Sequence, residues 1–232
     1  MSEIIYFKKT IKLLKTKKVF EPNLTTQAII EAFEKLNFSK KKKILDLGAG
    51  SGVIGIYLKK KYGKKIDLFL SDKSTHTVNV IDSNLMLNNL KGIAKESDIL
   101  KGWGNEKFDI IINDISAISS DIAKKHWYNK FIPHNCGKDG IKLSKKFLNA
   151  VEKNVNKGGC ILIPVISLSD HNQLVNLIKK KFKIKLLIKK EWPAPKNLIK
   201  GMVAKFLKKE YIFQKYNTYL CFTKVYKLQK KN

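Results

Sequence analysis

Short apolar runs alternate along the chain with longer segments whose apolar residues recur at helical spacing. The runs predict strands, which are Ile44–Leu47, Ile66–Leu70, Ile93–Lys95, Phe108–Ile112, Cys160–Ile166, Ile184–Ile188 and, by alternation, Tyr216–Tyr226. The helical spacing predicts helices, which are Gly52–Lys61, Thr77–Leu90, Ile141–Val155, ended by Lys157-Gly158-Gly159, and Asp170–Phe182. Strands that alternate with helices predict an α/β fold with a parallel, doubly wound sheet covered on both faces.

Two segments lie outside this pattern. Residues 1–36 predict a short hairpin and then a helix in FEPNLTTQAIIEAF, which Thr25 or Thr26 would cap. Residues 37–232 form the predicted main domain, with a basic amphipathic helix inserted at about 196–214. That helix either packs on the sheet with its lysines outward or docks a substrate or RNA.

Charge is the unusual feature of the composition. Lys+Arg is 47 and Asp+Glu is 19, a difference of +28, and every basic residue is lysine. Such a surface suits a polyanion such as RNA, although a generally basic, solvated surface without a specific partner explains it equally well. Because arginine is the preferred residue for bidentate recognition, lysine alone favours loose attraction to a phosphate backbone over base reading.

The remaining composition indicates a cytoplasmic protein. The sequence has no apolar run long enough for a transmembrane helix and no recognisable signal peptide at its N-terminus. Cys136, Cys160 and Cys221 are scattered, so we expect free thiols in a reducing compartment and neither a disulfide framework nor a metal site.

The strongest motif is Asp46-Leu-Gly48-Ala-Gly50-Ser-Gly52-Val-Ile-Gly55, at a strand-to-helix turn. Glycines allow a tight turn and a close approach of a ligand to the backbone, and the unpaired N–H groups of the helix start point at that ligand. The last three glycines also satisfy the GxGxxG dinucleotide pattern, which alone is a weak signal.

Two carboxylates distinguish the candidate ligands. Asp46 at the first strand end would repel a pyrophosphate but suits a cationic amine, and Asp72 after the second strand can accept hydrogen bonds from two ribose hydroxyls. Together they indicate S-adenosylmethionine, a zwitterionic nucleoside that carries a sulfonium. The structural alternatives are that Asp46 caps a turn and that Asp72 caps a helix.

With these motifs, residues 18–168 resemble the class I S-adenosylmethionine-dependent methyltransferases, in their HemK/PrmC-like "methyltransferase small domain" branch. The similar segments are VFEPNLTT, ILDLGAGSGVIGIYL, Asp72 with Ser74, Asn84 and Asn88, Ser97-Asp98, and Lys138-Asp139-Gly140 with Lys157-Gly158-Gly159. The resemblance implies a Rossmann-like, mostly parallel seven-stranded sheet with an antiparallel last strand. It also implies that Asp46, Gly48, Gly50 and Gly52 hold the methionine end of the cofactor, Asp72 its ribose and Asp98 its adenine.

The acceptor side of the resemblance is incomplete. Asn113 matches the first residue of the family's Asn-Pro-Pro-Tyr tetrapeptide, but Asp114-Ile-Ser replaces the rest. Asn113 and Asp114 are the candidate catalytic residues: Asn113 positions the acceptor, and Asp114 orients a nucleophile, holds a cationic amine or takes its proton, unless it only caps a turn. His126, Trp127 and Tyr128 supply a replacement aromatic wall or a packed lid, and His134 and Cys136 follow.

The sequence therefore predicts a methyltransferase that modifies a nitrogen, or another nucleophile, of a protein or RNA, and the charge favours RNA or an RNA-associated protein as partner. Two alternatives stay open. One is a non-catalytic RNA-binding protein on the same fold, which the lost Pro-Pro-Tyr favours, and the other is an NAD-dependent oxidoreductase, which Asp46 disfavours.

Overall fold

A computed structural model of the chain describes residues 2–6, 9–14, 16–123, 132, 135–194, 196 and 203–231. His126, Trp127, Tyr128 and His134 lie outside these residues, so the predicted aromatic wall stays a prediction. None of the described helices has the length and apolar character that crossing a bilayer requires.

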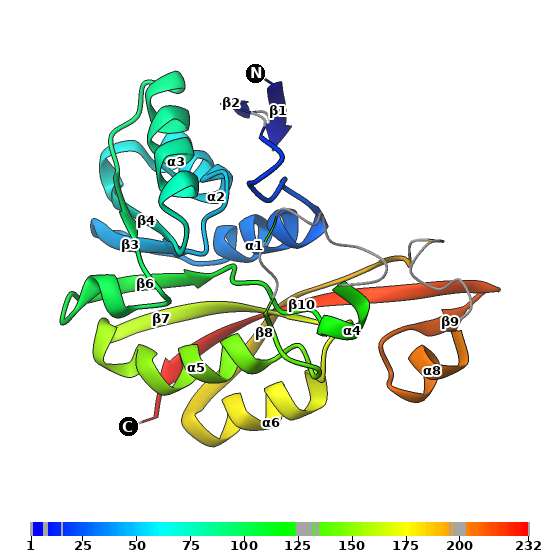
Figure 1. Cartoon of the computed structure of the whole chain (residues 1–232). Coiled ribbons are helices and arrows are strands. Elements are labelled where there is room, and N and C mark those ends of the chain that lie inside the picture. Colours follow the sequence, from blue (N-terminus) through cyan, green and yellow to red (C-terminus); the bar gives the residue numbers. More distant parts are fainter. Residues whose placement is uncertain are drawn as a thin grey trace.

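The main sheet has the strand order β5-β4-β3-β6-β7-β10-β8, with the short β9 paired to β10 (Figure 1). Its strands are β3 (Lys42–Leu47), β4 (Ile66–Asp72), β5 (Ile93–Glu96), β6 (Phe108–Asn113), β7 (Val155–Ile166), β8 (Phe182–Pro193), β9 (Phe213–Lys215) and β10 (Thr218–Lys230). From β5 to β7 all pairs are parallel, whereas β10 runs antiparallel to both β7 and β8. The predicted mostly parallel sheet with an antiparallel last strand is confirmed.

Helices cover both faces of this sheet, with α1, α2 and α3 on one side and α5 and α6 on the other (Figure 1). The helices are α1 (Leu24–Glu34), α2 (Val53–Tyr62), α3 (Thr75–Leu87), α4 (Ser120–Ile122), α5 (Lys142–Ala150), α6 (His171–Lys181) and α8 (Val203–Lys208). Adjacent strand residues point to opposite faces, so Ile44 packs with the first group and Leu45 with the second. This is why the central strands are apolar without alternation.

The N-terminal segment folds as predicted into a hairpin, β1 (Ser2–Tyr6) and β2 (Lys9–Leu13), followed by α1. The predicted cap of α1 was wrong by two or three residues. Asn23 is the N-cap, since its side chain accepts hydrogen bonds from the N–H groups of Thr25 and Thr26 at 2.8 and 3.2 Å. Thr26 completes a capping box by accepting from the N–H of Asn23. The division of the chain at residue 36 stays a prediction.

The predicted end of the helix before β7 was also wrong. Helix α5 ends at Ala150, a 3₁₀ turn occupies Val151–Asn154, and β7 starts at Val155. Lys157-Gly158-Gly159 therefore lies inside a strand, where the register slips: Phe108 pairs with Val155 but Ile110 pairs with Cys160. Gly158 takes a positive φ of 75° in this bulge, so the glycines serve a strand irregularity and not a helix end.

The predicted helix at 196–214 ends earlier in the structure, because α8 ends at Lys208 and Phe213 begins β9, whereas residues 197–202 lie outside the described residues. Phe206 of α8 is fully buried and packs with Tyr211, Ile212 and Trp192 in a third apolar cluster. This cluster also includes Ile122 of α4, so the α8–β9 segment is packed onto the loop that follows β6. We call residues 203–217 the basic lobe.

Candidate functional site

The loops that follow β3, β4 and β6 are held side by side at the carboxyl edge of the sheet. The carbonyl of Ser71 accepts hydrogen bonds from the N–H groups of Gly48 and Ala49, at 2.9 and 3.0 Å. On the other side, the N–H of Asp114 donates to the carbonyl of Leu47 at 2.9 Å. These bonds extend the strand ladder beyond the strand ends, so the glycine turn lies between the Asp72 loop and the Asp114 loop. The carboxyl ends of the strands are where open α/β sheets bind ligands.

The glycine turn needs its glycines for shape as well as for space. Gly48 has a φ of 76°, a left-handed conformation that side chains disfavour. A Cβ at Gly48 would also lie 3.1 Å from the backbone of Asp114 and Ile115. Gly48 thus lets the turn contact the acceptor loop directly, and Gly52, with a φ of 77°, starts α2 where no side chain caps its N–H groups.

Asp46 is fully buried beneath this turn. One carboxylate oxygen, Oδ2, accepts from the N–H of Gly55 at 2.9 Å, whereas Oδ1 is buried without a hydrogen-bond partner in the described structure. Burial raises the pKa of Asp46 to about 7, the Gly55 hydrogen bond opposes the rise, and the charge of Asp72 adds to it. A buried acceptor of this kind calls for a cationic or donor group close by.

Asp72 is held in one orientation by the backbone. Its Oδ2 accepts from the N–H of Gly50 and its Oδ1 from the N–H of Ser74, both at 3.2 Å. Ser74, and not Asp72, is the N-cap of α3. Burial raises the pKa of Asp72 although these hydrogen bonds lower it. Each oxygen keeps further acceptor capacity, which is what a ribose diol requires.

Asp98 differs from the other predicted residues because a lysine already pairs with it. Lys146 of α5 donates to its Oδ2 at 2.7 Å, and this hydrogen bond lowers the pKa of Asp98. The neighbouring Ser97 donates its N–H to the carbonyl of Asp72, which joins the Asp98 loop to the Asp72 loop. The structure therefore brings Asp98 to the same edge of the sheet.

Asn113 and Asp114 form the end of β6 and have different environments. The Asn113 side chain is buried and its Oδ1 accepts from the N–H of Ile115 at 3.3 Å, so it shapes its own loop. Asp114 is partly exposed, and no described residue donates to its carboxylate. Burial raises the pKa of Asp114 well above its usual value, and the nearby charge of Asp46 raises it further.

The loop after Asp114 is braced by residues that the sequence did not single out for this purpose. The Cys136 thiol donates to the carbonyl of Ser116 at 3.2 Å, and Ser119 donates to the carbonyl of Lys138 at 2.7 Å. A Cβ at Gly140 would lie 2.5 Å from the N–H of Ser119, which explains the glycine of Lys138-Asp139-Gly140. Burial raises the pKa of Cys136, so the thiol stays protonated and acts as a structural donor.

Three of the four carboxylates at this edge, those of Asp46, Asp72 and Asp114, have no lysine partner among the described residues, whereas Asp98 is paired with Lys146. The ion pairs of the structure involve other acidic groups, such as Asp67, Asp98 and Asp139. In a chain with a formal charge of +28, an edge lined by unpaired carboxylates is a local reversal of charge. It favours a cationic ligand.

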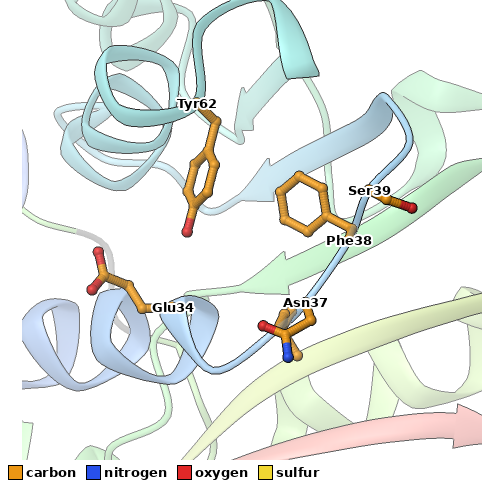
Figure 2. A pocket seen from close by; sticks show the side chains of 6 residues that line it. Glu34, Asn37, Phe38, Ser39 and Tyr62 are labelled. Atoms are coloured by element: carbon orange, nitrogen blue, oxygen red, sulfur yellow. The ribbon is translucent and has the colours of Figure 1, made fainter.

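A separate hollow of about 550 Å³ lies at the opposite, amino edge of the sheet (Figure 2). Phe38 and Tyr62 form its aromatic side, with ring centroids 5.3 Å apart, and Glu34 of α1 lies across from them. The Glu34 carboxylate already accepts hydrogen bonds from Tyr57 and Lys61. This hollow is distant in the topology from the glycine turn and is not part of the site.

Comparison with known proteins identifies the family. Residues 13–115 match the model of the "Methyltransferase small domain". The chain is also 31% identical over 170 residues to a protein of Methanocaldococcus jannaschii assigned as a protein N5-glutamine methyltransferase, covering 73% of this chain and 83% of that protein. The chain belongs to the class I S-adenosylmethionine-dependent methyltransferases. Its methyl donor is therefore S-adenosylmethionine, and the oxidoreductase alternative is excluded.

Two further matches agree with this methyltransferase family. The release factor glutamine methyltransferase of Borreliella burgdorferi is 30% identical over 154 residues, which are 63% of this chain and 53% of that protein. This chain thus spans about half the length of that relative. The crystal structure of a methyltransferase from Pyrococcus furiosus, at 16% identity, superposes with a TM-score of 0.58 and covers 95% of this chain and 90% of that one, which supports the fold alone.

Proposed function

We propose that this methyltransferase modifies a nitrogen of a protein or RNA substrate where the glycine turn meets the end of β6. The observation that carries the proposal is the close approach of the glycine turn to the backbone of Asp114 and Ile115, which would lie 3.1 Å from a Cβ added at Gly48. This approach supports a site in which the methyl donor, on the glycine turn, and the acceptor, at the end of β6, lie next to each other.

The residues of the glycine turn fit the methyl donor. The unpartnered Oδ1 of Asp46 suits the cationic methionine end, together with the close approach that Gly48, Gly50 and Gly52 permit. Asp72 would hold the ribose hydroxyls and Asp98 the adenine edge. When bound, S-adenosylmethionine supplies an electrophilic methyl group on its sulfonium.

On the acceptor side, Asn113 would position the nitrogen and Asp114 would orient it and take its proton. Positioning at short range is the main contribution that a protein makes to such a displacement. The carboxylate of Asp114, which has no partner among the described residues, supports the role of base, because burial and the nearby charge of Asp46 raise its pKa and so raise its affinity for a proton. The replacement of Pro-Pro-Tyr supports an acceptor different from a planar amide.

RNA is favoured as the substrate, or as the molecule that carries it, by the basic lobe. Tyr216 at the tip of the β9–β10 hairpin is 91% exposed, and the Nζ of Lys215 lies 5.5 Å from its ring centroid. Lys205, Lys208 and Lys209 add exposed positive charge on and just after α8. An exposed aromatic ring among lysines is suited to stacking on bases beside a phosphate backbone. The relatives assigned as glutamine methyltransferases support a protein instead.

Label transfer from S-adenosylmethionine with a radioactive methyl group tests the proposal. We expect cell extract incubated with the protein to gain label in a macromolecular fraction, and digestion with ribonuclease or protease to show which polymer carries it. Label that ribonuclease removes supports an RNA, and label that protease removes supports a protein. No label in either fraction, with S-adenosylhomocysteine bound at micromolar concentration, would contradict a macromolecular substrate.

We also propose a cytoplasmic location, which the three scattered cysteines support.

Donor affinity should rise with pH. Because the folded-state pKa of Asp46 is raised to about 7, the carboxylate is largely protonated at acidic pH and becomes the charged partner of a cation only near neutrality. Binding a cation favours the ionised form, so binding releases a proton and is weaker below the raised pKa. We expect roughly tenfold tighter S-adenosylmethionine binding at pH 7.5 than at about pH 5.5 by calorimetry. Asp46→Asn should flatten the profile, and a wild-type affinity independent of pH would contradict the assignment.

A further inference from the structure

Two buried asparagines, Asn84 of α3 and Asn88 at the C-cap of that helix, hold the edge of the N-terminal hairpin. Asn88 accepts from the N–H of Lys12 at 3.1 Å and donates to the carbonyl of Lys12 at 2.8 Å. Asn84 accepts from the N–H of Leu14 at 2.8 Å. Asn84 is fully buried and Asn88 is 7% exposed, so these hydrogen bonds are shielded from water.

The pattern of these bonds is that of a strand ladder. Antiparallel pairing with β1 uses one edge of β2, and the backbone groups of Lys12 and Leu14, two residues apart, face the same way along the strand. Asn84 and Asn88 are four residues apart and share one face of their helix. The asparagine amides thereby satisfy the strand edge in place of a third strand, and this fixes the hairpin on α3.

We call the hydrogen bonds of Asn84 and Asn88 to the hairpin the clamp. Asn84 also links this clamp to the glycine turn. The Nδ2 of Asn84 donates to the carbonyl of Ser51 at 2.8 Å, between Gly50 and Gly52. One side chain thus joins the hairpin to the loop assigned to the methyl donor.

The segment that leaves the hairpin passes over that loop. A Cβ at Gly50 would lie 3.6 Å from the carbonyl oxygen and 3.8 Å from the Cβ of Phe20. Val19 is buried, and Phe20, Pro22 and Leu14 line a cavity of about 130 Å³ together with Ser51. The N-terminal segment therefore forms one wall of this cavity beside the glycine turn. Figure 1 shows the hairpin above α1.

We propose that the β1–β2 hairpin and residues 16–22 form a cover for the methyl-donor site, and that Asn84 and Asn88 are the positioning residues that hold this cover on the glycine turn. The proposal rests on the assignment of that turn to S-adenosylmethionine. Donor binding fixes the position of the Ser51 carbonyl. Because Asn84 bonds both to that carbonyl and to the N–H of Leu14, the hairpin is held in place as well. The closed cover then slows dissociation of the donor. Because the clamp acts through shared hydrogen bonds, its effect falls on donor affinity and not on the chemistry of transfer.

The variant Asn88→Ala tests the clamp, because among the described residues the Asn88 side chain bonds only to the hairpin and to its own helix. Asn79→Ala is the matched control, an exposed asparagine on the same helix. The measurements are the Kd of S-adenosylhomocysteine by calorimetry, hydrogen exchange of residues 9–23 with and without that ligand, and the melting temperature. We expect a Kd roughly tenfold higher in Asn88→Ala, from the loss of the two partly buried hydrogen bonds to the hairpin, with the maximal transfer rate at saturating donor unchanged.

Hydrogen exchange separates the possible outcomes. In the wild type, ligand binding should slow exchange in residues 9–23, and in Asn88→Ala this protection should be reduced while exchange in β3 and β6 stays as in the wild type. Unchanged exchange in the wild-type hairpin on ligand binding, or wild-type affinity in a folded Asn88→Ala, would overturn the cover. Absence of ligand binding to the wild type would instead remove the donor assignment itself. If Asn88→Ala melts early, Asn88→Gln, which keeps an amide but displaces it, gives the same comparison.

Discussion

Replacing Asp114 by Asn should lower the maximal rate of methyl transfer by roughly 10²- to 10⁴-fold, the usual contribution of a positioned proton acceptor. Asparagine keeps the size of the side chain and the backbone bond from the N–H of Asp114 to Leu47, so the loop should keep its shape. It cannot accept a proton. The Kd of S-adenosylhomocysteine should change by no more than about threefold, since the proposal assigns Asp114 to the acceptor and not to the methyl donor.

The pH dependence sharpens this prediction. Burial raises the pKa of Asp114, so the wild-type rate should rise with pH as the carboxylate loses its proton, whereas the rate of Asp114→Asn should lack this rise. Asp121→Asn is a suitable control, because Asp121 lies in the same connection but pairs with Lys205 of the basic lobe, at 3.9 Å. Wild-type turnover in Asp114→Asn at saturating donor would rule out the role of base and leave turn formation as the function of Asp114.

Replacing Asp72 by Ala should weaken donor binding by roughly 100-fold or more. The change removes a charged acceptor for two hydroxyl groups, and a hydrogen bond to a charged group contributes about 1.5–3 kcal/mol. It also frees the N–H groups of Gly50 and Ser74, which the Asp72 carboxylate now satisfies at 3.2 Å, so the glycine turn loses its anchor to β4. Calorimetry with S-adenosylhomocysteine measures the effect.

Asp67→Ala provides the control for Asp72. Asp67 lies on the same strand, is exposed, and pairs with Lys41 at 2.7 Å on the surface, where an ion pair contributes little to stability. Its variant should bind the ligand as the wild type does. If Asp72→Ala keeps wild-type affinity and the wild-type melting temperature, the ribose is held elsewhere and the donor site must be reassigned.

Several predictions from the sequence rested on properties that a residue shows together with its immediate neighbours in the chain. The apolar runs of β4 and β6 ended within two residues of the strand ends, because the central part of a parallel strand is mostly buried on both faces and polar residues follow where the strand leaves the sheet, as at Asn113 and Asp72. The glycine turn was recognisable because its left-handed conformations and close contacts exclude side chains at Gly48. These features need no knowledge of distant neighbours.

Other features had no local signal. Two threonines follow Asn23, and only the geometry of the chain entering α1 shows which residue is the cap. The glycines after α5 match a helix end equally well, and the bulge that they form is imposed by the pairing of β7 with β6. The sequence does not show that Cys136 and Asn84 donate hydrogen bonds to loops of the site. These bonds go to the carbonyl groups of Ser116 and Ser51, which lie 20 and 33 residues away.

The sequence by itself determined the order of strands and helices, the glycine turn and the acidic residues at the strand ends, because periodicity, steric demand and charge are properties of neighbouring residues. Only the tertiary structure decided that Asp46 is buried with one oxygen unpartnered, that Asp98 is paired with Lys146 while Asp114 is unpaired, and that two asparagines join the N-terminal hairpin to the glycine turn. These are outcomes of burial and of contacts between segments far apart in the chain, which set the solvation and the hydrogen-bond partners of each group.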